Sequence, residues 1–164
     1  MRFQYCPDCG TQLVPRPIGD EGLVPWCETC GKPLFDMFST CVIVLVVNEE
    51  EEALLLRQSY LSDRYHNLVS GYMKPGETAE SCAAREVEEE TGIAVDSLQI
   101  QGTWWFGKKD MLMIGFVARA KKGEFTLSSE VDAARWVPME EAQGLVHPQG
   151  SVSYAMIELY RSKQ

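Results

Sequence analysis

Two groups of residues in this chain have the types and spacing of chemical sites. The first lies in "REVEEETGI", where Arg85 is followed by Glu86, Glu89 and Glu90. Carboxylates this close repel one another, so a helix that only had to fold would not favour them. Carboxylate oxygens are the ligands that Mg2+ and Mn2+ prefer. The run therefore predicts a site for a hard divalent cation.

A predicted helix from about Ala79 to Thr91 places these glutamates in space. Thr78 suits its N-cap, and Gly92 suits the position after its C-terminus. At about 100° per residue, the three glutamates fall within an arc of roughly 100°, on the face that otherwise carries small, buriable residues. Glu88 points roughly the opposite way and is expected in solvent. This arrangement favours a cation site over a solvated run of charge.

The second group consists of four cysteines in two C-x2-C pairs, namely Cys6, Cys9, Cys27 and Cys30. Seventeen residues separate the pairs, which is the spacing of a zinc ribbon. Two disulfides or a redox pair are the alternatives. The chain shows no secretory signal, and in a reducing compartment such cysteines are more often metal ligands. Four thiolates would form a closed, structural Zn2+ site.

Composition limits the classes of partner. The chain has 164 residues and a net charge of −9, which argues against general electrostatic binding to nucleic acid. No apolar run approaches the roughly 20 residues of a spanning helix, so a membrane is not expected as a partner. The N-terminal "MRFQYCPDCG" has no apolar signal segment. A cytoplasmic location is the resulting expectation.

The pattern along the chain indicates two domains. Residues 1–36 are rich in Pro, Gly and Cys, and such a segment needs a cross-link, such as a structural metal ion or disulfides, to fold. Residues 37–164 alternate strand and helix patterns, which predicts an α/β domain. The predicted strands are 40–47, 53–58, 67–72, 95–106, 111–120 and 133–137, and the later predicted helices are 138–145 and 151–162.

Residues 71–93 resemble the Nudix box, G-x5-E-x7-R-E-U-x-E-E-x-G-U, where U is a bulky aliphatic residue. Every fixed position of the motif is present: Gly71, Glu77, Arg85, Glu86, Val87, Glu89, Glu90, Gly92 and Ile93. The resemblance extends from about residue 37 to the end. It implies an α/β/α sandwich with a mixed sheet. It also implies cleavage of a nucleoside diphosphate linked to another group X, with Mg2+ or Mn2+ as catalytic ions.

The resemblance also implies roles for individual residues. Glu86, Glu89 and Glu90 would be metal ligands, supported by Glu77 and Arg85. The carbonyl of Gly71 is a further candidate ligand. A loop outside the box often supplies another glutamate, and Glu130 in "LSSEVDAARWV" is the candidate here. The general base remains open among Glu130, Glu86 and Glu89.

The order of a zinc ribbon before a Nudix domain is similar to the NADH pyrophosphatase family. That family carries S-Q-P-W-P-F-P-x-S where this chain has "QGTWWFGKKDMLM", residues 101–113. The aromatic cluster is retained, whereas Ser-Gln-Pro and the later prolines are missing. NADH or NAD+ is the leading substrate, and ADP-ribose or FAD is the alternative. A nucleotide-sensing module without catalysis is the non-enzyme alternative, and the intact motif disfavours it.

Several side chains are candidates for contacts with this nucleotide-derived small molecule. Aromatic rings could stack on a base, and a lysine could meet a phosphate; the candidates are Tyr72, Trp104, Trp105, Phe106 and Lys108. Sheet core, a dimer contact or a solvated hairpin tip are the competing interpretations. A capped RNA end is the one nucleic-acid substrate kept open. The resemblance also makes a homodimer an open expectation.

Overall fold

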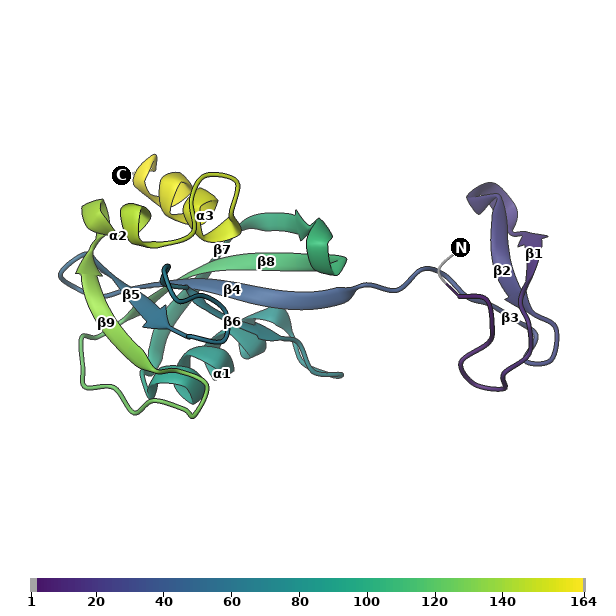
Figure 1. The fold of residues 1–164 in the computed structure, drawn as a ribbon, viewed down its shortest axis with the longest axis horizontal. Coiled ribbons are helices and arrows are strands. Elements are labelled where there is room, and N and C mark those ends of the chain that lie inside the picture. The colour runs from purple at the N-terminus through teal and green to yellow at the C-terminus, as the bar shows by residue number, and fades with distance from the viewer. Residues whose placement is uncertain (1–2, 164) are drawn as a thin grey trace. The chain divides into compact units, whose positions relative to one another are not determined.

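The computed structural model describes residues 3–163 and divides the chain into two compact units, with the division after Phe38 (Figure 1). No helix among the described residues combines the length and the apolar character needed to cross a membrane.

The first unit is a small antiparallel sheet of three strands. Its elements are β1 (Val14–Pro17), the 3-10 turn η1 (Gly19–Glu21), β2 (Leu23–Cys27) and β3 (Lys32–Pro33). The buried core is small and consists of Cys6, Leu13, Cys27 and Leu34, with Phe3 packed against it. Because two of these four residues are cysteines, apolar burial alone gives this unit little stability.

The second unit contains a six-stranded mixed sheet. Its strands are β4 (Ser39–Val47), β5 (Glu52–Arg57), β6 (Val69–Tyr72), β7 (Val95–Phe106), β8 (Met111–Ala120) and β9 (Ala133–Pro138). The order is β7-β8-β4-β5-β9, and β6 pairs with β4. The β4–β8 pair is parallel and the other pairs are antiparallel. The predicted mixed sheet is therefore confirmed.

Helices cover both faces of this sheet. Figure 1 shows α1 (Ala79–Thr91) on one face and α2 (Met139–Leu145) and α3 (Val152–Arg161) on the other. Each face has its own core, one containing α1 residues and the other residues of α2 and α3. The central strand β4 is buried on both faces, which explains its unbroken apolar run "CVIVLVV". The α/β/α sandwich is therefore confirmed.

The ends of α1 follow the sequence-based expectation. The Thr78 side chain accepts a hydrogen bond from the backbone N–H of Ser81 at 3.2 Å, as an N-cap does. Gly92 has a φ of 73°, and its N–H donates to the Glu88 carbonyl. These caps set where the helix begins and ends, and so they set which way its glutamates face.

Three local details differ from the expected elements. Strand β6 begins at Val69, because Asn67 makes only an isolated bridge to Leu56. Helix α2 begins at Met139, with Pro138 as its N-cap. The expected turn at 107–110 is a 3-10 helix, η2 (Gly107–Lys109), followed by Asp110 in the left-handed region.

Candidate functional site

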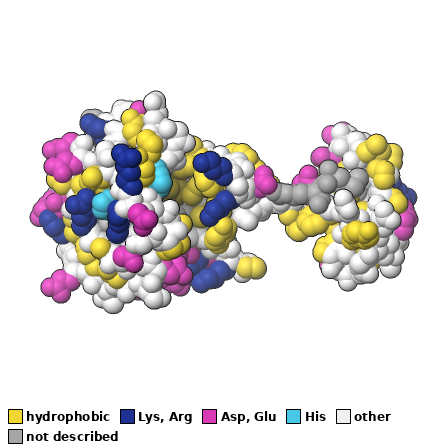
Figure 2. All heavy atoms as spheres, in the orientation of Figure 1, with side chains coloured by type: hydrophobic (Ala, Val, Ile, Leu, Met, Phe, Trp, Pro, Cys, Tyr) yellow, Lys and Arg dark blue, Asp and Glu magenta, His cyan; other side chains and the backbone are white. Residues whose placement is uncertain are grey.

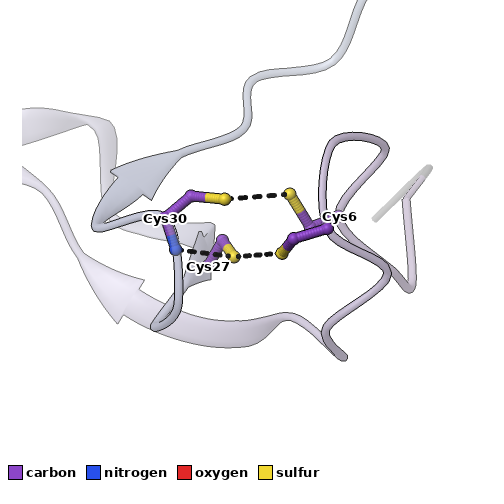
Figure 3. A group of neighbouring side chains, drawn as sticks. Cys6, Cys27 and Cys30 are labelled. Atoms are coloured by element: carbon purple, nitrogen blue, oxygen red, sulfur yellow. Dashed lines mark hydrogen bonds between the residues drawn. The ribbon is translucent and has the colours of Figure 1, made fainter.

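The four cysteines of the first unit converge on one point. One ligand atom from each lies within 4.8 Å of the others. The sulfurs of Cys6 and Cys30 are 3.9 Å apart, and those of Cys9 and Cys27 are 3.4 Å apart. Figure 3 shows the labelled side chains directing their sulfurs toward one another from two turns. Such a group of thiols suits one tetrahedral ion.

The two turns that carry the cysteines have the same construction. In each, the N–H of the following glycine, Gly10 or Gly31, donates to the carbonyl of the first cysteine at 2.9 Å. Both glycines have positive φ, which L side chains rarely adopt. The N–H of Cys30 also lies 3.3 Å from the sulfur of Cys27, as donors around a metal-bound thiolate do. The chemistry and the shape of the group fit Zn2+.

The second unit places the acidic run of α1 against β6. Glu90 is 5% exposed, whereas the Glu86 and Glu89 side chains are 13% and 53% exposed. Glu88 lies on the solvent side, as expected. The three glutamates therefore lie on one side of the helix but differ in depth, with Glu90 innermost and Glu89 at the rim.

Arg85 ties these carboxylates together. Its Nε and Nη2 donate to the two oxygens of Glu77 at 2.6 and 3.0 Å, and its Nη1 donates to Glu86 at 2.6 Å and Glu89 at 2.9 Å. The pKa of Glu77 is lowered to about 2, because the Arg85 side chain and the Lys74 backbone N–H donate to the carboxylate. Glu77 and Arg85 thus form a fixed support beneath the other two glutamates.

Glu90 is in an unusual environment for a carboxylate. Its Oε1 accepts a hydrogen bond from Gln58, whereas its Oε2 is buried with no hydrogen-bond partner among residues 3–163. Burial, with the nearby charge of Glu86, raises the pKa of the Glu90 carboxyl to about 7. A buried acceptor without a partner is costly, and a cation would satisfy it. The donor set therefore fits a hard divalent cation.

The carboxylates are less tightly gathered than the thiols. Among the His, Cys, Asp and Glu side chains of residues 3–163, the four cysteines are the only group of three or more whose ligand atoms all lie within 4.8 Å of one another. The physical reason is that Arg85 draws Glu86 and Glu89 toward its guanidinium, while the negative charges repel one another.

Gly71 of β6 lies directly against Glu86. A Cβ added at Gly71 would lie 1.9 Å from the Cδ of Glu86 and 2.1 Å from its Oε1. No side chain larger than hydrogen fits while this carboxylate keeps its place. The backbone of β6 at Gly71 therefore lies directly against the Glu86 carboxylate.

If the acidic face is catalytic, replacing Gly71 by alanine is expected to lower the rate of the reaction there by roughly 100-fold, because the Glu86 carboxylate would be displaced by about 1 Å. Thermal stability should change little, since the side chain that must move is flexible and only part-buried. Initial rates and thermal melts of purified protein measure both quantities. Gly144→Ala is the matched control, because its Cβ meets nothing within 4 Å. Equal rates for both variants would contradict the prediction.

A cavity of about 1180 Å3 opens beside this acidic face. One part is polar and acidic, and contains Glu86, Glu89, Glu90 and Glu130. Apolar side chains form another part of its lining, called the apolar chamber below, namely Cys41, Ile43, Phe106, Met111 and Met113. Lys108, Lys109 and residues 147–153 also line the cavity. Ligand pockets commonly hold 300–1,000 Å3, so this one is large enough for a small-molecule ligand.

The structure separates the predicted substrate contacts into two sets. Tyr72, Phe106 and Lys108 line the cavity, as does Glu130. The two tryptophans do not line it. Trp104 packs into the core on the α3 side, and the neighbouring Trp105 is 55% exposed. Consecutive residues of a strand point to opposite faces, so Trp104 and Trp105 could not both face one pocket.

Sequence reasoning missed two parts of the site. The loop that follows β5 brings Tyr60 to the cavity, and the loop before α3 contributes a wall that includes His147. A ring contact with centroids 4.8 Å apart joins His147 to Tyr65. The only sequence signal for this wall was the small-residue turn "HPQGS" before the last helix.

Comparison with known proteins identifies the second unit. The family model of the NUDIX domain matches residues 37–160, which is most of the chain. The chain belongs to the Nudix family. The match includes the whole Nudix box and both walls of the cavity.

Individual Nudix relatives cover the first unit as well. The chain is 31% identical over 164 residues to the NAD-capped RNA hydrolase NudC of Stutzerimonas stutzeri, covering 99% of this chain and 58% of the relative. It is 34% identical over 149 residues to Nudix hydrolase 19, chloroplastic, of Arabidopsis thaliana, covering 85% and 33%. The chain thus spans between one third and three fifths of the length of these relatives.

A solved structure supports the fold. The NUDIX hydrolase from Nitrosomonas europaea aligns with a TM-score of 0.71 at 19% identity, covering 99% of this chain and 94% of that one. At this identity the likeness shows the Nudix fold alone.

Proposed function

We propose that the chain is a metal-dependent Nudix pyrophosphohydrolase. It cleaves the diphosphate of a nucleoside diphosphate linked to X, with NADH or NAD+ as the leading substrate and AMP and a nicotinamide mononucleotide as products. Residues 37–164 form the catalytic domain, and residues 1–36 form a ribbon stapled by structural Zn2+ through Cys6, Cys9, Cys27 and Cys30.

One observation carries this proposal: the acidic face and an apolar chamber share one cavity. Glu90 supplies an unpartnered buried oxygen on one side, and Phe106, Met111 and Met113 supply apolar surface on the other. A dinucleotide has the matching division, since its diphosphate needs cations and its rings need apolar surface. The name of the Stutzerimonas stutzeri relative, an NAD-capped RNA hydrolase, points to the same class of substrate.

The residues of the chain have distinct roles in this reaction. Glu86, Glu89 and Glu90, with the Gly71 carbonyl, would hold Mg2+ or Mn2+, which lowers the pKa of a bound water and neutralises phosphate charge. Arg85 and Glu77 keep the carboxylates in place. The exposed Glu130 carboxylate can accept the proton of the attacking water. Lys108 and Lys109 lie in the same cavity and can contact the distal part of the substrate.

The surface limits how a longer substrate could bind. Figure 2 shows small groups of Lys and Arg side chains interrupted by Asp and Glu on one face of the larger unit, rather than a continuous basic stripe. With a net charge of −9, extended contacts to RNA are electrostatically unfavourable. A capped RNA therefore fits only by its 5′ end.

A second candidate substrate is ADP-ribose or FAD. The specific observation in its favour is "QGT" at residues 101–103, where Ser-Gln-Pro would mark the NADH pyrophosphatase family. The same adenosine diphosphate half would then occupy the acidic part of the cavity, with a different group in the apolar chamber.

The deciding experiment is a hydrolysis screen with Mg2+ or Mn2+ on the purified chain. The panel contains NADH, NAD+, an NAD-capped oligoribonucleotide, ADP-ribose, FAD, diadenosine polyphosphates and nucleoside triphosphates. We expect metal-dependent release of AMP from NADH or NAD+. If these are inert while ADP-ribose or FAD is cut, the second candidate replaces the first. Binding without cleavage of any of them would favour a sensing module.

A further inference from the structure

Gln58 is a buried amide that no motif of the chain explains. It follows the last residue of β5 and is 2% exposed. Its Nε2 donates a hydrogen bond to Glu90 Oε1 at 3.1 Å and lies 3.4 Å from the hydroxyl oxygen of Tyr60. Its own Oε1 is buried without a hydrogen-bond partner among residues 3–163.

This arrangement is unfavourable for stability alone. Two buried oxygens, Gln58 Oε1 and Glu90 Oε2, have no hydrogen-bond partner in the described part of the chain. An unsatisfied buried acceptor costs free energy, and an apolar side chain of the same size at position 58 would remove one of them. The amide is therefore better explained by its effect on Glu90. Its hydrogen bond occupies Oε1 and leaves Oε2 as the ligand atom.

The backbone holds this amide in a defined place. The carbonyl of Gln58 accepts hydrogen bonds from the N–H groups of Leu61 and Ser62 at 2.9 and 3.1 Å. The next residue, Ser59, is tied through its N–H and its hydroxyl to Asp132 Oδ2, both at 2.6 Å. Because both sides of the residue are anchored, the side chain approaches Glu90 from a fixed base.

We propose that Gln58 is a positioning residue for the divalent cation. Its hydrogen bond to Oε1 orients the Glu90 carboxylate. Oε2 then already faces the ion, and the Glu90 side chain need not change rotamer when the ion binds. The inference rests on the proposed function, because the cation belongs to that proposal. It adds a residue outside the Nudix box, 32 positions before its partner, to the machinery of the site.

The test is a Mn2+ titration of the full chain, with free Mn2+ followed by electron paramagnetic resonance. Gln58→Met keeps the size of the side chain but removes the donor. We expect the Kd for Mn2+ to rise about 10-fold, the usual effect of losing a group that orients a metal ligand. At saturating Mn2+, KM should stay within twofold of the parent value while kcat falls.

Gln101→Met is the matched control, because Gln101 lies on β7 outside the cavity and also has an unpartnered buried oxygen. Its Kd for Mn2+ should equal that of the parent. If Gln58→Met does not fold, the Kd for Mn2+ is measured on Gln58→Asn instead. The side chain of asparagine is one methylene too short for its amide to reach Glu90. A folded position-58 variant whose Kd stays within twofold of the parent overturns the inference. A parent chain that binds no Mn2+ overturns the proposed function together with it.

Discussion

Glu90→Gln is expected to lower the metal-dependent rate by about 1,000-fold. The change removes the charge of a proposed metal ligand. A metal ion contributes several kcal/mol of charge stabilisation, and losing about 4 kcal/mol of it lowers a rate by about 1,000-fold. The fold should persist, because glutamine is nearly isosteric and needs no charge to be buried, whereas burial and the charge of Glu86 raise the pKa of the Glu90 carboxyl to about 7. Initial rates at saturating Mg2+, with thermal melts in chelator, measure both effects.

Glu88→Gln provides the control for this experiment. Glu88 sits on the same helix two residues earlier but is exposed, and no hydrogen bond or ion pair involves its side chain among the described residues. Its rate should remain within twofold of the parent. The assignment of the acidic face would be wrong if Glu90→Gln retained near-normal activity, or if both variants lost activity equally.

Removal of zinc is expected to unfold the first unit. Two of its four core residues, Cys6 and Cys27, are themselves the proposed ligands, so little apolar core remains without the ion. Structural zinc supplies about 10–16 kcal/mol of apparent folding free energy in small domains. Without the ion the thiols differ in charge: hydrogen bonds to Thr11 lower the pKa of Cys9 to about 6, while hydrogen bonds to Cys9 and Cys27 raise that of Cys30 to about 12.

Elemental analysis and amide NMR spectra can follow this loss together. We expect one zinc per chain before treatment, and a collapse of the dispersed signals of residues 3–38 after a thiol reagent has released it. Cys27→Ser should behave in the same way. Thr29→Val is the control, since it breaks only the exposed hydrogen bond to Thr11 beside the cluster. Dispersed signals from residues 3–38 in a zinc-free sample would contradict the prediction.

Helical periodicity explains why so much of the acidic face could be inferred in advance. The caps at Thr78 and Gly92 and a repeat of 3.6 residues are local properties, so the sequence alone placed Glu86, Glu89 and Glu90 on one side and Glu88 on the other. The unbroken apolar run of β4 likewise indicated a strand covered on both faces. Local reasoning did not predict how deeply each glutamate is buried. The burial of Glu90 depends on β6 and on Gln58, which follows β5, as well as on α1.

The aromatic cluster shows what strand periodicity alone does not decide. Residues 104–106 were taken together as stacking candidates, but only Phe106 lines the cavity. Strand alternation turns Trp105 to the opposite face, and Trp104, on the same face as Phe106, packs into the core on the α3 side. The opposite wall, residues 147–153, comes from a segment about 40 residues further along the chain. Register and packing between distant segments decide such neighbours, and neither can be read from spacing.

The sequence by itself determined the family and predicted the two candidate metal sites, because thiolate pairs and glutamates at helical spacing are short-range patterns set by covalent geometry. Only the tertiary structure decided which carboxylate lies deepest, how closely Gly71 approaches Glu86, and that Gln58 reaches Glu90 from the end of another strand. The reason is physical: burial and hydrogen-bond partnership are properties of the assembled layers, in which residues far apart in the chain exclude water together.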